Sequence, residues 1–235
     1  MFLHNLVIFV AHLRLKYRAS LRQGGEVRFT AFERVQHLLL LSSFLALVVS
    51  GFALAYPRSW WAGTLQELGF VESVRSATHY VAALVLLLVS LIQGWYMVLY
   101  RRGRREALAI LPRGEDLRYF LALMRYYLEL RGARPAWHGR YDYTEKLEYL
   151  ALIWGTLIMA LSGFVLWFPE RFLTFLPSWS FEVAEVVHFY EAWLATLSIA
   201  VWHWYFAVFS PRHYPLNMSI VHGLEASGDE DENHG

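Results

Sequence analysis

The sequence predicts an all-α integral membrane protein: a bundle of four transmembrane helices in a parallel two-plus-two repeat, with interfacial and amphipathic helices on its cytoplasmic side. Of its 235 residues, 57% are hydrophobic. Four runs carry almost no ionisable side chains, and a helix that spans a bilayer needs about 20 such apolar residues. We therefore expect spans at about residues 33–56, 76–100, 145–168 and 182–209.

The positive charges predict the orientation of these spans. Of the 21 Lys and Arg residues, six lie from Arg14 to Arg34, before or at the start of the first span. Eleven lie from Arg101 to Lys146, between span two and the start of span three, and one follows span four. Only three lie in the other two connections. Because cytoplasmic loops are rich in Lys and Arg, both termini and the middle loop should be cytoplasmic. The alternative of a nucleic-acid-binding surface is disfavoured because these charges flank the spans.

The segments outside the spans complete the expected organisation, with residues 28–223 as one domain. Residues 1–27 form an N-terminal segment. Its first part, Met1 to Leu13, lacks the basic region and cleavage site of a signal peptide, and we expect it to be an interfacial helix. Helical spacing of apolar residues predicts an amphipathic cytoplasmic helix over about 115–131. The acidic residues 224–235 are typical of a disordered tail.

The two halves of the chain repeat one another without gaps inside their first helices. His37 corresponds to Tyr149, and each is followed fourteen residues later by the glycine of a Ser-Gly-Phe triplet. A proline follows each reference position by twenty residues. In the second helix of each half, His79 corresponds to His188, and Gly94 corresponds to His203. Agreement of these offsets is difficult to attribute to chance.

Four histidines lie inside the predicted spans, where ionisable groups are rare and usually functional. Given the orientation, His37 lies toward the cytoplasm, and His79 and His188 lie toward the outer face. His203 follows His188 by fifteen residues, which in an α-helix is ~22 Å of depth and a rotation of roughly 60°. The depths therefore pair His79 with His188 at the outer face and His37 with His203 at the inner face.

Two depth-matched histidine pairs favour two bis-histidine haems. Zinc is a weaker alternative, because two ligands are too few for a closed tetrahedral site. The chain has no cysteine, which excludes thiolate and thioether attachment of a cofactor within it. A different class remains open, namely a cofactor-free transporter or channel whose histidines relay protons. A third possibility is a structural membrane anchor in which the haems only hold the helices together.

Three glycines lie at the predicted haem depths and are expected to pack against the macrocycles. Gly94 is near the depth of His203, and Gly51 and Gly163 are near the depth of His79 and His188. A flat cofactor between helices needs surfaces without side chains. An equally good explanation is that small residues let membrane helices approach closely.

The sequence resembles the di-haem, four-helix cytochrome b membrane subunits of formate dehydrogenase, nickel–iron hydrogenase and thiosulfate-reductase-type enzymes. The resemblance covers Arg28 to about Gly223 and rests on Phe-Glu-Arg-Val-Gln-His at 32–37, the three further histidines, and Pro-Leu-Asn-Met-Ser at 215–219. It implies two haem b groups in a prokaryotic plasma (inner) membrane. It also implies a quinone substrate, menaquinone or ubiquinone, near the inner haem, and an iron–sulfur or multihaem cytochrome c partner at the outer face.

The start of the third span supplies polar side chains for such a quinone, at the depth of the inner histidine pair. The candidates are Tyr143, Glu145, Lys146, Glu148 and Tyr149. A positioned carboxylate such as Glu148 can pass protons to the cytoplasm. Alternatively, these residues merely flank a membrane helix and join its interfacial aromatic belt. With this site, the chain would be an electron-transfer subunit with no substrate chemistry beyond quinone redox.

Overall fold

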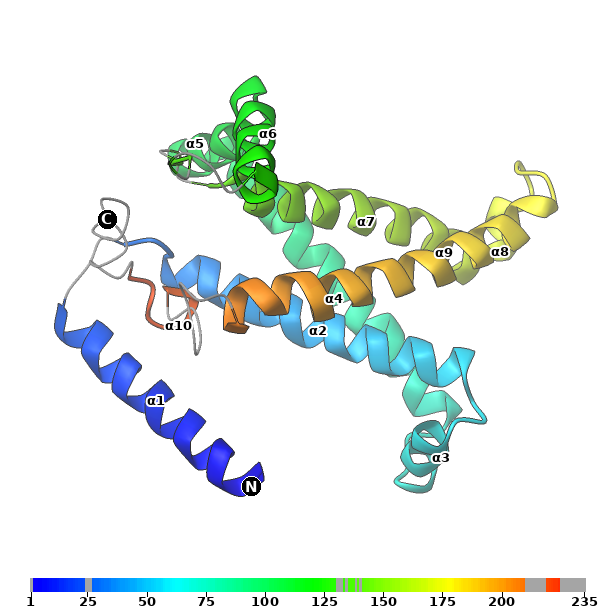
Figure 1. Ribbon diagram of the computed structural model, residues 1–235. Coiled ribbons are helices and arrows are strands. Elements are labelled where there is room, and N and C mark those ends of the chain that lie inside the picture. The colour runs from blue at the N-terminus through cyan, green and yellow to red at the C-terminus, as the bar shows by residue number, and fades with distance from the viewer. Residues whose placement is uncertain are drawn as a thin grey trace. The chain divides into compact units, whose positions relative to one another are not determined.

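The computed structural model describes residues 2–23, 27–129, 133, 135–137, 139, 141–209 and 219–224. Within these ranges every regular element is helical, apart from one isolated bridge between Val27 and Leu224 (Figure 1). This confirms the predicted all-α class. The acidic tail beyond Leu224 and most of the Pro-Leu-Asn-Met-Ser segment lie outside the described residues.

Within the described residues, four helices are long and apolar enough to cross a membrane, as the sequence predicts. They are α2 (Ala31–Ala55), α4 (Glu72–Leu99), α7 (Tyr143–Trp167) and the helix over Trp179–Phe209. Each begins two to four residues before the predicted boundary, because the first turn of a helix is polar and apolar patterning does not mark it.

The last span is not a uniform α-helix. It begins as α9 (Trp179–Leu197) and continues as two π-helical segments, η1 (Ser198–His203) and η2 (Tyr205–Phe209). A π segment accommodates more residues per turn than an α-helix and often occurs at functional sites. The predicted rise and rotation between His188 and His203 assumed an uninterrupted α-helix, and that estimate is therefore wrong.

The internal repeat is visible in the ends of α2 and α7. Thr30 caps α2 in a capping box with Glu33, and Asp142 caps α7 in a capping box with Glu145. The corresponding C-terminal residues, Tyr56 and Phe168, share a φ of −126° and ψ values of 58° and 53°. A capping box satisfies backbone N–H groups that a helix start leaves unpaired. The two halves therefore start and stop their first helix by the same local chemistry.

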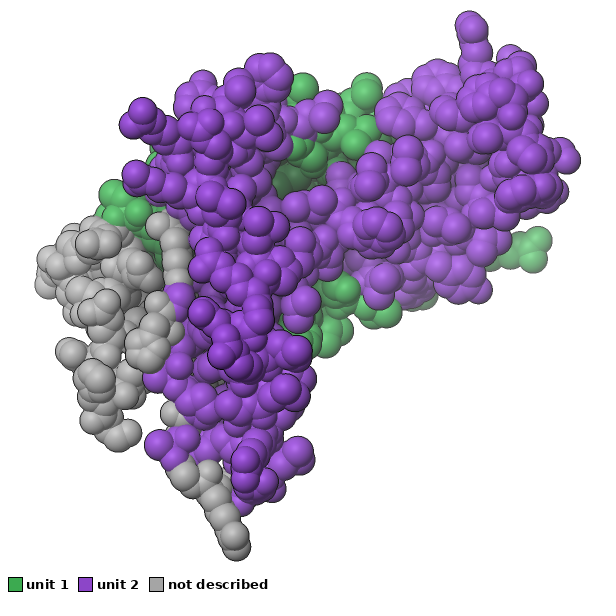
Figure 2. Space-filling model, turned by 90° about the horizontal axis from the view of Figure 1, so that it is seen from above, with its two compact units in different colours: residues 1–90, 196–235 green, residues 91–195 purple. Residues whose placement is uncertain are grey.

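The chain divides into two compact units, coloured separately in Figure 2. Unit 1 comprises residues 1–90 and 196–235, and unit 2 comprises residues 91–195. Besides the spans, unit 1 holds α1 (Phe2–Gln23), α3 (Trp60–Glu67) and α10 (Ser219–His222), and unit 2 holds α5 (Arg101–Ile110), α6 (Gly114–Glu129) and α8 (Pro169–Phe172).

These shorter helices modify three expectations. The N-terminal helix α1 extends ten residues beyond Leu13, through a basic stretch that apolar patterning does not identify as helical. Helices α3 and α5 were not predicted, and α6 ends at Glu129 rather than near residue 131. Short helices carry too few periodic positions for the apolar pattern to distinguish them from loops.

The spans bury small and polar side chains and expose large apolar ones. Ser43 and Ser50 are buried in α2, and Gly155 and Ser162 are buried in α7. In contrast, Trp154 is 63% exposed. In a bilayer, small residues let helices approach while large apolar groups face lipid. This distribution is the one expected of membrane-embedded helices.

A network of hydrogen bonds in unit 1 joins α10 to the start of α2. The backbone N–H groups of Arg28 and Phe29 donate to the Gly223 carbonyl at 2.9 and 3.0 Å, and Arg34 Nη1 donates to the Val221 carbonyl at 2.6 Å. Burial, and then the nearby Arg34 charge, lowers the pKa of His222. The neutral His222 ring accepts a hydrogen bond at Nδ1 from the Leu224 N–H, at 3.0 Å. Gly223 itself has a φ of +85°, which favours glycine.

Candidate functional site: four histidines and their surroundings

The two histidines predicted at the inner face come together in unit 1. His37 lies in the second turn of α2, and His203 is the last residue of η1. Their ring centroids are 6.3 Å apart, and the ring planes make an angle of 40°. Two residues separated by 166 positions therefore present their imidazoles to one another, as the depth argument predicted.

The two histidines predicted at the outer face have matching surroundings in their own units. In unit 1, His79 on α4 has its Nδ1 2.9 Å from Ser50 Oγ on α2. In unit 2, His188 on α9 has its Nδ1 3.0 Å from Ser162 Oγ on α7. The repeat therefore extends to the hydrogen-bond partner of each imidazole.

The glycines after these serines lie directly against the same rings. A Cβ atom on Gly51 would meet Cε1 of His79 at 3.4 Å, and one on Gly163 would meet Cε1 of His188 at 3.3 Å. A Cβ on Gly94 would meet no atom within 4 Å. Gly51 and Gly163 thus make room for an imidazole, and packing of all three glycines against haem stays a prediction.

Three of the five quinone candidates form contacts that stabilise the start of α7. Glu145 Oε2 accepts from the Asp142 N–H at 3.1 Å in the capping box. The ring of Tyr143 packs against Tyr119 and Phe120, with centroids 6.0 and 5.5 Å away. Lys146 is buried and forms an ion pair, described below. These side chains have structural roles that the sequence pattern does not reveal.

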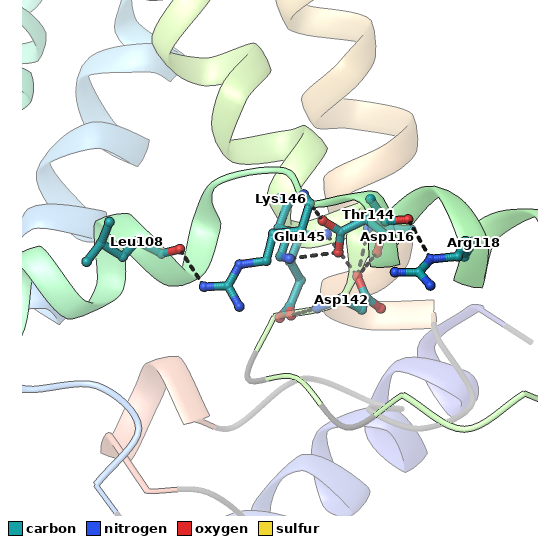
Figure 3. A network of polar contacts seen from close by, with 9 residues as sticks. Leu108, Asp116, Arg118, Asp142, Thr144, Glu145 and Lys146 are labelled. Carbon is teal, nitrogen blue, oxygen red and sulfur yellow. Dashed lines mark hydrogen bonds and ion pairs between the residues drawn. The ribbon is translucent and has the colours of Figure 1, made fainter.

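Lys146 belongs to a polar network between α6 and α7 in unit 2 (Figure 3). Its Nζ lies 2.7 Å from Asp116 Oδ1, and both residues are buried. The Arg113 N–H donates to the other carboxylate oxygen of Asp116 at 2.6 Å. Burial alone would raise the pKa of Asp116, but the hydrogen bonds and positive charges of Lys146 and Arg113 hold it below its usual value. The carboxylate is therefore ionised and paired.

Tyr149 is surrounded by different groups, all in unit 2. Its hydroxyl donates to Met97 Sδ at 3.2 Å, and Gln93 Nε2 approaches the hydroxyl oxygen at 3.5 Å. Oε1 of Gln93 is buried and accepts no hydrogen bond from the described residues. An unpaired amide oxygen in a span is costly. Gln93 precedes Gly94, which has open space beside it, so this cluster offers polar groups to a bound molecule.

Comparison with known proteins identifies the family. The sequence profile described as prokaryotic cytochrome b561 matches residues 28–217. This chain belongs to the prokaryotic cytochrome b561 family. It is a membrane electron-transfer cytochrome b of a prokaryote, and the family implies b-type haem. The match covers all four spans and all four histidines.

Individual relatives of this cytochrome are more distant. It is 22% identical over 211 residues to the formate dehydrogenase cytochrome b556(fdo) subunit of Escherichia coli strain K12, a match that covers 83% of the cytochrome and 92% of that subunit. The same subunit from strains O6:H1 and O157:H7 gives the same identity and coverage. No solved structure matches the chain.

The inner pair in this cytochrome b561 fits the dimensions of a haem site. A metal–imidazole nitrogen bond is ~2 Å and the ring centre lies ~1.1 Å further, so two axial rings across one iron have centroids about 6 Å apart. The observed 6.3 Å agrees. Within the described residues, no cluster of three or more His, Cys, Asp and Glu side chains could hold a metal ion. The ring separation therefore suits an axial pair.

Sequence reasoning about this cytochrome missed Ser50, Ser162 and Gln93. The two serines belong to the repeated Ser-Gly-Phe triplet. The repetition of this triplet could have indicated a role for serine, but only its glycine was considered. Gln93 is the residue before Gly94 and is the only amide side chain in α4. An amide in a membrane span is itself a pointer to function.

Proposed function

We propose that the chain holds two b-type haems and carries electrons between membrane quinone and a peripheral redox enzyme. His37 and His203 would be the axial ligands of the inner haem, and His79 and His188 those of the outer haem. The observation that carries this proposal is the 6.3 Å separation of the His37 and His203 rings. When bound, each haem would supply one-electron redox chemistry through its iron.

The same separation argues against a direct proton relay between these two imidazoles. Two imidazoles joined by one hydrogen bond of ~3 Å have ring centroids about 5 Å apart. The 6.3 Å between His37 and His203 exceeds that value and suits an intervening metal. The cofactor-free transporter is therefore the weaker explanation.

Haem content is the direct test of the function. We expect the purified protein to show a reduced-minus-oxidised spectrum of b-type cytochrome, and extracted haem at two per chain. The haem should be extracted without chemical cleavage, because the chain has no cysteine for a thioether link. A preparation of folded protein with no haem would favour the transporter, and one haem per chain would reject the double pairing.

We place the quinone at the inner face, beside Tyr149, Gln93 and Glu148. Tyr149 and Gln93 supply hydrogen-bonding groups suited to the carbonyl oxygens of a quinone. Glu148 is half-buried one residue earlier and would exchange protons with the cytoplasm. Tyr143, Glu145 and Lys146 would support this site by fixing the start of α7.

Substituting Tyr149 with phenylalanine, or Gln93 with leucine, should slow quinol-linked reduction of the inner haem by about tenfold, the value of one hydrogen bond. Both variants should retain two haems. The measurement is stopped-flow haem reduction by a quinol, with the exposed Tyr190→Phe as a matched control. Glu191 lies on α9, one turn after His188. If both variants react normally while Glu191→Gln does not, the quinone site lies toward the outer face.

The cytochrome is proposed to be the membrane subunit of an oxidoreductase complex, as the name of its formate dehydrogenase relative indicates for that protein. An iron–sulfur or multihaem cytochrome c subunit would meet the outer haem. Transfer of one charge across the membrane is worth ~2.3 kcal/mol per 100 mV, so electron flow between the two faces would couple to the membrane potential.

The membrane orientation predicts the result of reporter fusions. Fusions after Tyr56, Gly103, Arg171 and the C-terminus should report outside, inside, outside and inside. The reason is the excess of Lys and Arg in the segments assigned to the cytoplasm. An external C-terminus would reverse the assignment of inner and outer histidines.

A further inference from the structure

Ser50 and Ser162 occupy equivalent places in the repeat, and each contacts one outer histidine. Ser50 Oγ lies 2.9 Å from Nδ1 of His79, and Ser162 Oγ lies 3.0 Å from Nδ1 of His188. We infer that these serines are positioning residues that fix the proton on Nδ1, so that the lone pair that would bind iron is on Nε2. The inference rests on the proposed role of His79 and His188 as haem ligands.

The direction of each hydrogen bond follows from the serine's single hydroxyl proton. Ser50 Oγ lies 2.6 Å from the Ala46 carbonyl, and Ser162 Oγ lies 2.7 Å from the Ile158 carbonyl. A carbonyl oxygen only accepts, so at these distances it takes the hydroxyl proton. The serine oxygen must then accept from Nδ1–H.

The tautomer of each imidazole follows directly. A neutral imidazole carries one proton, and with that proton on Nδ1 the lone pair is on Nε2. A hydrogen bond from the other ring nitrogen is the usual means by which a protein orients a metal-binding histidine. The backbone of Met159 forms a further hydrogen bond with His188.

Burial makes this hydrogen bond difficult to replace. Ser50 is fully buried and Ser162 is 7% exposed, so bulk water cannot take over as acceptor. The adjacent glycines, Gly51 and Gly163, face the same rings, since a Cβ atom there would meet the ring Cε1 at 3.4 and 3.3 Å. Each Ser-Gly pair therefore fixes one imidazole both by a polar contact and by a flat backbone surface.

Two other serines provide matched controls. Ser43 Oγ donates to the Leu39 carbonyl at 2.7 Å, and Ser90 Oγ donates to the Leu86 carbonyl at 2.8 Å. Both have the same bond to a carbonyl four residues earlier. In the part of the chain that the structure describes, neither forms a hydrogen bond with a histidine. Alanine at these positions removes a helical serine without touching an imidazole.

The experiment compares Ser50→Ala and Ser162→Ala with Ser43→Ala and Ser90→Ala in the full chain. Loss of the serine acceptor weakens the hydrogen bonding of Nδ1–H and makes the imidazole a weaker donor to iron. We expect the midpoint potential of the outer haem to shift upward and its retention against excess apomyoglobin to weaken by about tenfold. The inner haem and both control variants should be unchanged.

Ser162→Thr keeps a hydroxyl and should retain the unmodified potential, which separates loss of the hydrogen bond from loss of packing. An outer-haem potential and low-spin electron paramagnetic resonance spectrum that are unchanged in both alanine variants would overturn the inference, as would equal shifts in the controls. Failure of the proposed function is recognised separately: the unmodified protein would then lack the outer haem, or His79→Ala would retain it.

Discussion

Replacing His203 with alanine is expected to halve the haem content of the purified protein, from two haems per chain to one. His37 and His203 face one another across 6.3 Å, and each would supply one axial bond to the inner haem. A haem without a covalent link to the protein depends on those bonds and on packing, so loss of one ligand should release it. Quinol-linked reduction of the remaining haem should be lost as well.

The measurement is extracted haem per chain, together with the reduced-minus-oxidised spectrum of the variant. His37→Ala should give the same result, because both variants remove a ligand of the same haem. The exposed His12, which lies in α1 outside the spans, provides the control, and His12→Ala should retain both haems. Loss of both haems, or retention of two normal six-coordinate haems in His203→Ala, would contradict the pairing.

Replacing Asp116 with alanine should destabilise the protein by about 3 kcal/mol, the lower end of the range for breaking a buried ion pair. The substitution removes the carboxylate partner of the buried Lys146 ammonium group and leaves that group beside the ring of Trp137, 5.3 Å from its centroid. The cost arises from burying an uncompensated charge, not from the lost attraction alone. Unfolding in detergent, followed by circular dichroism, measures it.

A double variant separates these two contributions. Asp116→Leu combined with Lys146→Met removes both charges, and replacing a buried pair by apolar groups is often nearly neutral. We therefore expect the double variant to recover most of the stability lost in the single one. If Asp116→Ala is as stable as the unmodified protein, the pair does not anchor α6 to α7.

Acid should weaken the same contact. The pKa of Asp116 is lowered in the folded protein, so this carboxylate contributes stability that is complete above its unfolded pKa of ~3.9. That contribution is lost as the pH falls through the lowered folded value. The stability difference between the unmodified protein and Asp116→Asn should therefore shrink below about pH 4.

The repeat explains why so much could be read from the sequence. Whether a segment spans the membrane depends on the summed hydropathy of its contiguous residues, and this sum can be calculated without the tertiary structure. The Ser-Gly-Phe triplets are likewise local and recur at one offset. The capping boxes at Thr30 and Asp142 recur at the same offset but were found only in the structure. The approach of His37 to His203 followed from orientation and depth, because a bilayer reduces the placement of helices to few choices.

Sequence alone therefore determined the class, the four spans and the four histidines. Only the tertiary structure decided which polar side chains are already paired. Lys146 is paired with Asp116, 30 residues earlier, and Ser50 contacts His79, 29 residues later. Such partners lie on different helices, and the spacing of apolar residues along one helix does not indicate which residues of another helix it contacts. The π-helical end of the last span was equally hidden, because a one-residue change in helical winding leaves hydropathy unaltered.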